Sequence, residues 1–161
     1  MTANIGLTEE QKQQSSLILQ RILADEFVLY TKTRNYHWNV EGDNFIELHE
    51  FYERLYNELD EVFDEVAERI RMLGHYSQGR LKDFLKITSL GEEDYTNNQQ
   101  EQLRNLLSDH ETLTRLLRND IDKLDDELHD KGNADFVTGL LKSHEKWAWF
   151  VRSYIKDDTK M

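Results

Sequence analysis

The chain contains no proline in its 161 residues, so no residue in it is bound to break a helix. Apolar residues recur at spacings of three and four along four long segments, which is the pattern of helices that bury one face against a core. Strand-type alternation between turn residues is missing. The expected helices run from about residue 8 to 38, 44 to 73, 98 to 129 and 134 to 155. The sequence therefore predicts an all-α fold.

The connections between these helices predict the architecture. Short turns around Gly42 and Gly132 make two antiparallel hairpins, whereas a long connection over residues 75–93 joins the second helix to the third. This connection contains a short amphipathic piece, Leu81 to Ile87. We expect a ferritin-like four-helix bundle with a short extra helix in the long crossover between helices 2 and 3. It should form a single domain over residues 1–161, with short flexible termini at about 1–7 and 156–161.

The charge balance is acidic, with 32 Asp and Glu against 20 Lys and Arg and a formal net charge of −12. Such a surface attracts cations and repels nucleic acid, because neither end of the chain supplies a lysine-rich tail. The absence of cysteine excludes disulfides and thiolate metal sites. No signal-peptide pattern follows Met1, and no apolar run approaches the ~18 residues of a membrane span. We expect a cytoplasmic protein.

Imidazole and carboxylate side chains gather around the first turn and along the helix that follows it. His37 and His49 lie six residues to either side of position 43, so a hairpin that turns there brings their rings opposite each other. Relative to His49, the residues Glu53, Asp64 and Glu68 lie at about 40°, 60° and 100° around a helix. They therefore share one stripe. These side chains suit a divalent first-row metal such as iron, manganese or zinc.

The spacing along the second helix prevents one chain from closing this site. His49 and Asp64 are separated by about 22 Å of helix, whereas metal–ligand bonds are about 2 Å long. An antiparallel crossing of two such helices brings the His49 and Glu53 end of one chain to the Asp64 and Glu68 end of the other. Both pairs of positions are symmetric about the midpoint between residues 58 and 59, as a two-fold interface requires. Two unrelated half-sites are the alternative.

Each of these residues also has a plain structural interpretation. A single histidine is more often a structural polar residue than a ligand, and Asp64 with Glu68 would ordinarily form a solvated helix face. Their joint symmetry favours ligation. The usual di-metal pattern of a bundle, Glu-x-x-His on two helices, does not appear, and its nearest match is Asp126-x-x-His129.

Three stretches resemble the Dps family, the starvation-induced mini-ferritins, and the resemblance covers essentially the whole chain. They are Asn35-Tyr-His-Trp-Asn-Val, Asn44-Phe-Ile-Glu-Leu-His-Glu and Asp64-Glu-Val-Ala-Glu-Arg. The resemblance implies a homo-oligomeric, dodecameric shell of four-helix subunits. Ferroxidase sites would lie at its two-fold interfaces, and iron oxide would be stored inside.

The ligand motif of the family maps onto five residues of this chain, and position 53 departs from it. The family commonly has Asp there, and the extra methylene of the Glu moves the carboxylate oxygens by about 1 Å or more. The implied chemistry is oxidation of Fe(II) by hydrogen peroxide, or more slowly by dioxygen, which protects DNA from oxidative damage. Iron is the expected metal, with zinc or manganese as substitutes. The five residues are His37, His49, Glu53, Asp64 and Glu68.

The resemblance also implies roles around the site. Trp38 corresponds to the family tryptophan, which either packs in the core or takes part in redox chemistry, and Arg34 is placed to pair with a bridging carboxylate. By analogy, an acidic pore for ion entry lies near the turn between the third and fourth helices. Its candidates are Asp122, Asp126 and Asp130, each of which is alternatively an ordinary solvated residue at a helix end.

Two other functions compete with that of an iron-oxidising storage shell. One is a DNA-binding protein that compacts the nucleoid, and the other is a non-catalytic helical assembly that binds metal structurally. The net charge argues against the first. The second would bind metal but leave peroxide untouched.

Weak or absent DNA binding is the first testable consequence. Because counterion release requires clustered cationic side chains, we expect no retardation of plasmid DNA in a gel-shift assay at about 150 mM salt. Retardation at that ionic strength would favour the nucleoid-compacting function instead.

Overall fold

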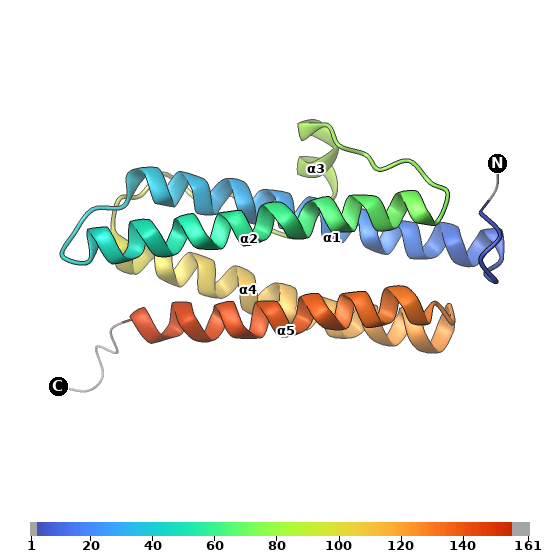
Figure 1. Ribbon diagram of the computed structural model, residues 1–161. Helices are drawn as coiled ribbons and strands as arrows, with labels where there is room; N and C mark the ends of the chain where they lie inside the picture. The colour runs from blue at the N-terminus through green and yellow to red at the C-terminus, as the bar shows by residue number, and fades with distance from the viewer. Residues whose placement is uncertain (1–2, 156–161) are drawn as a thin grey trace.

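The computed structural model describes residues 3–155 and confirms the predicted all-α fold. Two antiparallel hairpins lie side by side, the first made by α1 and α2 and the second by α4 and α5 (Figure 1). No strand occurs among residues 3–155. Of the termini expected to be flexible, residues 1–2 and 156–161 lie outside the described range. The helices are α1 Glu9–Asn39, α2 Phe45–Met72, α4 Gln99–Asp122 and α5 Lys131–Tyr154.

The first helix begins at Glu9, next to the expected start at about residue 8. Thr8 accepts a hydrogen bond from the backbone N–H of Gln11 at 3.2 Å, and the Gln11 side chain accepts the N–H of Thr8 at 2.8 Å. This capping box satisfies two backbone donors that the first helical turn cannot satisfy itself. Gly42, with φ +129°, forms the turn into α2.

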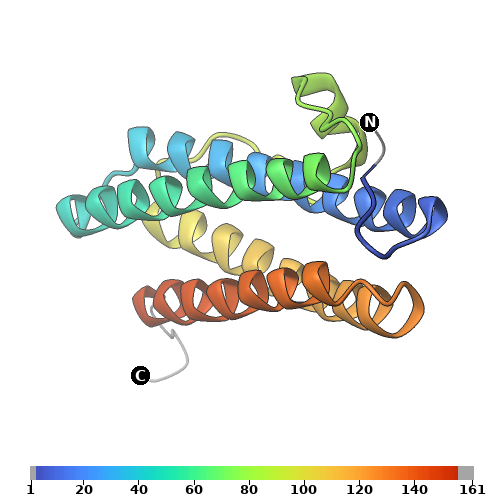
Figure 2. The ribbon, with the colours of Figure 1, turned by 45° about the vertical axis from the view of Figure 1, so that its right-hand side comes forward.

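The long crossover contains the predicted short helix, α3 Leu81–Ile87, which stands out from the α1–α2 hairpin (Figure 2). The Phe84 ring of α3 stacks on the Phe27 ring of α1 at a centroid distance of 4.5 Å. Beyond α3, the buried Asp25 carboxylate accepts hydrogen bonds from the Thr88 hydroxyl at 2.9 Å and from the backbone N–H of Ser89. These contacts fix the crossover along α1.

The turn into α5 differs from the prediction. The fourth helix was expected to begin at about Ala134, but α5 begins at Lys131. The reason is Asp130, whose carboxylate accepts the backbone N–H of Asn133 at 3.2 Å and its side-chain amide at 2.6 Å. A cap of this kind starts a helix even with Gly132 in its first turn.

The third helix does not continue regularly to residue 129 as predicted. After Asp122 it widens into a π-helical turn over Lys123–Glu127, in which the N–H of Leu128 bonds to the carbonyl of Lys123 at 3.0 Å. His129 then adopts a left-handed conformation with φ +52°. The π turn adds a residue to the helix and so changes which face the following side chains occupy.

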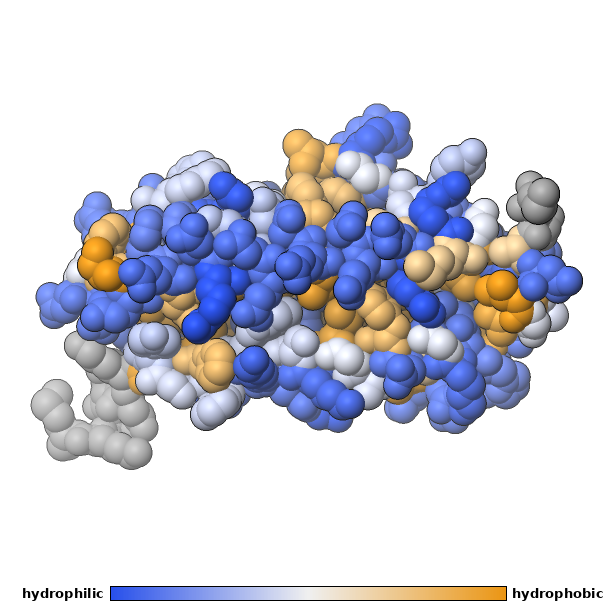
Figure 3. Space-filling model, in the orientation of Figure 1, coloured by the Kyte–Doolittle hydropathy of each residue, from blue (hydrophilic) through white to orange (hydrophobic). Residues whose placement is uncertain are grey.

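Apolar side chains fill the space between the hairpins in two clusters. One surrounds Ile22 and Val66 towards the turn between α4 and α5, and the other surrounds Leu55 and Leu106 towards the turn between α1 and α2. The outer face in Figure 3 is mostly hydrophilic, with hydrophobic side chains in the groove between α2 and α5 and on α3. No helix among residues 3–155 is long and apolar enough to cross a membrane.

A polar chain crosses this apolar core. The Glu26 carboxylate of α1 accepts a hydrogen bond from Nε2 of His144 on α5 at 2.8 Å, and Nδ1 of His144 lies 3.0 Å from Nδ1 of His110 on α4. All three side chains are at most 1% exposed. Burial and the neighbouring His144 hold the pKa of His110 well below its usual value. His110 is therefore neutral in the folded protein.

Acid should destabilise the bundle through His110. Below about pH 6.5 the unfolded chain binds a proton on this histidine that the folded chain refuses, so the free energy of unfolding falls as pH falls. We expect His110→Leu to lower stability at neutral pH and to flatten this decline, measured by urea denaturation between about pH 7 and pH 5. The half-buried His75 lies outside the core, and His75→Gln should keep the wild-type slope. An unchanged slope in His110→Leu would contradict this account.

Candidate functional site

The two histidines predicted to face each other across the first turn do so. The Nδ1 atom of His37 lies 2.8 Å from the backbone carbonyl oxygen of His49, and the Nδ1 atom of His49 lies 2.9 Å from that of His37. Their rings stack at a centroid distance of 3.8 Å with an interplanar angle of 20°. This reciprocal pair ties the end of α1 to the start of α2.

The reciprocal bonds fix the chemistry of both rings. A carbonyl oxygen only accepts hydrogen bonds, so Nδ1 of each ring carries the proton. In the neutral imidazole, Nε2 then holds the lone pair. Hydrogen bonding of Nδ1 to a carbonyl is also the arrangement that orients histidine ligands in metal sites. His37 and His49 thus offer two preoriented nitrogen donors.

The carboxylates predicted to join them lie along the surface of α2. Glu53, Asp64 and Glu68 are all exposed, as are Asn57 and Asp60 between them on the same stripe. Residues 3–155 of one chain contain no group of three or more His, Asp or Glu side chains arranged to hold a metal ion. The structure therefore brings His37 and His49 together and leaves Asp64 and Glu68 further along the helix, about 22 Å and about 28 Å from His49 at ~1.5 Å per residue.

Arg34 and Trp38 lie beside the histidines on α1. The Arg34 guanidinium carbon is 4.5 Å from the centroid of the Tyr56 ring, 5.4 Å from that of Trp38 and 5.7 Å from that of Tyr30. Trp38 is 65% exposed, so it does not pack in the core of its own subunit. A cation held between aromatic faces in this way keeps its charge close to the histidine pair.

Tyr56 is a residue of this region that sequence reasoning missed. Its ring meets the edge of His37 at a centroid distance of 5.3 Å and an interplanar angle of 80°. Its hydroxyl donates to the Glu53 carboxylate at 3.4 Å. The available signal was its position three residues after Glu53, which places both side chains on one face of α2.

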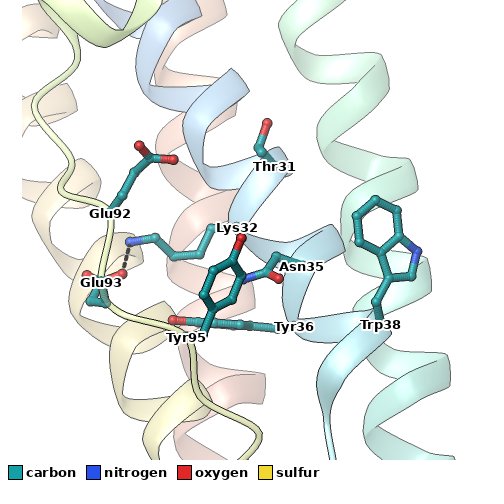
Figure 4. A pocket seen from close by; sticks show the side chains of 8 residues that line it. All are labelled: Thr31, Lys32, Asn35, Tyr36, Trp38, Glu92, Glu93 and Tyr95. Carbon is teal, nitrogen blue, oxygen red and sulfur yellow. Dashed lines mark ion pairs between the residues drawn. The ribbon is translucent and has the colours of Figure 1, made fainter.

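A pocket of about 390 Å³ opens between α1 and the crossover segment, as Figure 4 shows. Lys32 bonds there to Glu93 at 2.7 Å and to the buried Asp109 at 2.6 Å, and Trp38 lies at the far edge of the pocket. Burial raises the pKa of Asp109 to about 6 against the opposing effect of Lys32. On Lys32, burial lowers the pKa, but Asp109 and Glu93 outweigh it and the net shift is upward.

The three aspartates expected at a pore differ in their surroundings. Asp122 and Asp126 are exposed at the end of α4 and in the π turn. Asp130 is 5% exposed, and both its carboxylate oxygens bond to Asn133 at the start of α5. Asp130 thus caps α5, and the pore remains a prediction for all three.

Comparison with known proteins identifies the class. The ferritin-like domain family matches residues 17–161. An uncharacterized low temperature-induced protein of Nostoc sp. is 44% identical over 154 residues, which are 95% of this chain and 86% of that protein. DNA protection during starvation protein 2 of Bacillus anthracis is 33% identical over 141 residues, which are 86% of this chain and 94% of that protein.

A solved structure of a Dps protein has a fold very similar to that of this chain. The crystal structure of the Dps protein of Vibrio cholerae O1, a member of a broad superfamily of ferritin-like diiron-carboxylate proteins, has a TM-score of 0.90 at 30% identity and covers 96% of this chain and 97% of its own. The present chain is therefore a ferritin-like protein. Within that class it belongs to the Dps family, as its motifs predicted.

Loss of the buried cation beside this site should be costly and pH-dependent. Lys32→Met leaves the Asp109 carboxylate buried without its cation, and we expect a loss of about 3–5 kcal/mol in the free energy of unfolding at about pH 8. The loss should shrink near pH 5, where Asp109 takes a proton because its pKa is raised. Denaturant titration at both pH values measures this, with Lys32→Met/Asp109→Leu as the control that removes the stranded charge. A pH-independent loss would contradict the explanation.

Proposed function

We propose that this protein is a ferroxidase and iron-storage subunit. It oxidises Fe(II) with hydrogen peroxide, or more slowly with dioxygen, at sites shared between two chains, and stores the ferric product in a hollow shell. The observation that carries the proposal is the reciprocal hydrogen bonding of His37 and His49, which presents two nitrogen donors next to the stripe of carboxylates on α2. Membership of the Dps family supports it.

The donor set suits iron in both oxidation states. Neutral imidazole binds Fe(II), and carboxylates bind the harder Fe(III), so a mixed set can hold the substrate before and after oxidation. The ligands we assign are His37, His49 and Glu53 from one chain and Asp64 and Glu68 from a second copy. Zinc would occupy the same donors without being oxidised, because Zn²⁺ has no redox chemistry, and manganese would suit them as well. The pairing of two chains explains why the carboxylates on α2 are exposed in a single subunit.

Two iron ions at one site balance the reaction. Each Fe(II) gives one electron, and hydrogen peroxide takes two electrons and two protons to become two molecules of water. A peroxide reduced in this way releases no hydroxyl radical. The same reaction therefore removes both Fe(II) and hydrogen peroxide, which together cause oxidative damage. DNA is thereby protected without being bound. The names of relatives such as DNA protection during starvation protein 2 of Bacillus anthracis accord with this outcome.

The direct test follows Fe(II) oxidation after anaerobic mixing with hydrogen peroxide. We expect oxidation of about two iron ions per peroxide, since each peroxide accepts two electrons, and near-complete loss of the rate in His49→Ala/Asp64→Ala. Wild-type protein that is no faster than iron in buffer would exclude catalysis. A structural metal site would then be the better account.

Mixing two inactive variants tests the shared site. His49→Ala and Asp64→Ala each damage every site in their own dimers. In a mixed dimer one site carries both changes and the other carries neither, so co-assembly at equal amounts should restore about a quarter of the sites. Refolding or co-expression, followed by the peroxide assay, measures the recovery. His49→Ala mixed with His49→Ala/Asp64→Ala is the matched control, in which no intact site can form. Equal activity in the two mixtures would exclude a site shared in this way.

A further inference from the structure

Tyr56 contacts three functional groups in the region around His37 and His49. Its side chain is 8% exposed, its ring lies against His37, and its hydroxyl donates to Glu53 Oε1 at 3.4 Å. The Arg34 guanidinium covers the face of the same ring at 4.5 Å. Tyr56 therefore contacts a cation, an imidazole and a carboxylate at once.

If Glu53 binds a metal ion, its carboxylate needs a contact that fixes its orientation. It is exposed, and a glutamate has three side-chain torsions whose freedom is lost when a ligand fixes them. The neighbouring Tyr56 follows it by three residues on the same helix face. A hydroxyl bonded to Oε1 restricts the carboxylate and leaves Oε2 to bind a metal ion.

Arg34 strengthens this contact through the ring. The Tyr56 hydroxyl is the donor in this contact, because the carboxylate oxygen of Glu53 only accepts hydrogen bonds. A cation over the ring face draws electron density from the phenol and makes its O–H a better donor. Arg34 is itself held in place, because its Nη1 donates to the Tyr30 hydroxyl at 3.1 Å.

We propose that Tyr56 is a positioning residue for the Glu53 carboxylate, and that Arg34 acts on Glu53 through the Tyr56 ring. This inference rests on the proposed function, because it assumes that Glu53 binds metal. The hydroxyl sets which carboxylate oxygen faces the metal position, and the distance in the free protein shortens when the metal draws the carboxylate into place. Tyr56 touches no metal itself.

The test uses cobalt(II) chloride as the probe, added to the assembled protein under nitrogen with no oxidant present. The visible absorption of bound cobalt reports the number and geometry of its ligands. We expect Tyr56→Phe, which keeps the ring, to weaken cobalt binding roughly three- to tenfold, the range for one lost hydrogen bond. Arg34→Met should weaken it in the same direction, and Arg34→Lys should restore part of the loss by keeping a cation over the ring.

A double-mutant cycle tests whether the Tyr56 hydroxyl acts through Glu53. Glu53→Asp shortens the side chain and withdraws the carboxylate from the hydroxyl, so adding Tyr56→Phe to it should cause no further loss. Equal losses in both backgrounds would show that the hydroxyl acts by a route other than Glu53, and no loss in either would also overturn the proposal. His49→Ala is the control for the site as a whole. If it leaves cobalt binding unchanged, the proposed site fails together with this inference; if it abolishes binding while Tyr56→Phe has no effect, only the positioning role fails.

Discussion

The reciprocal hydrogen bonds between His37 and His49 are the interaction on which this site depends. Each imidazole is held by a backbone carbonyl of the opposite helix, so closure of the α1–α2 hairpin also orients both rings. A shift of either helix by one residue would break both contacts. Aromatic packing between α1 and α2 supports this closure. Phe63 contacts Phe27 and Tyr30, Tyr30 contacts Tyr56, and the Arg34 guanidinium lies over the Tyr56 ring.

Buried charge holds the rest of the subunit to this hairpin. Lys32 and Asp25 both project from α1, and they bind the crossover through Glu93 and through Thr88. Glu26, also on α1, reaches His144 on α5. Ionic and polar ties of this kind add little stability relative to apolar packing, but they penalise any arrangement in which the partners do not meet. α1 thus sets the positions of the crossover and of the second hairpin.

The sequence predicted the helices and the histidine pair well because both depend on local spacing. The start of α1 near residue 8 and the extra helix at Leu81 follow from patterns within one or two helical turns. The start of α5 was missed because Asp130 was not recognised as a helix cap, a role that its carboxylate fills. The hydrogen-bonded chain of Glu26, His144 and His110 could not be predicted from the sequence, because its members come from three helices that only the tertiary fold brings together. Tyr56 was overlooked for a simpler reason: a tyrosine among core residues reads as packing.

The distribution of donors along α2 also bears on when the chemistry can begin. On the proposed function, a newly made chain carries both halves of a site, at opposite ends of one helix, and no complete one. Such a chain would not oxidise iron before it met a second copy. Ferric product then forms only where assembled protein already exists to retain it. Once dimers come apart, total activity should fall with the square of dilution, so the activity per chain should fall in direct proportion to dilution. The separation of the two half-sites along α2 would thus make iron oxidation depend on the assembly that stores its product.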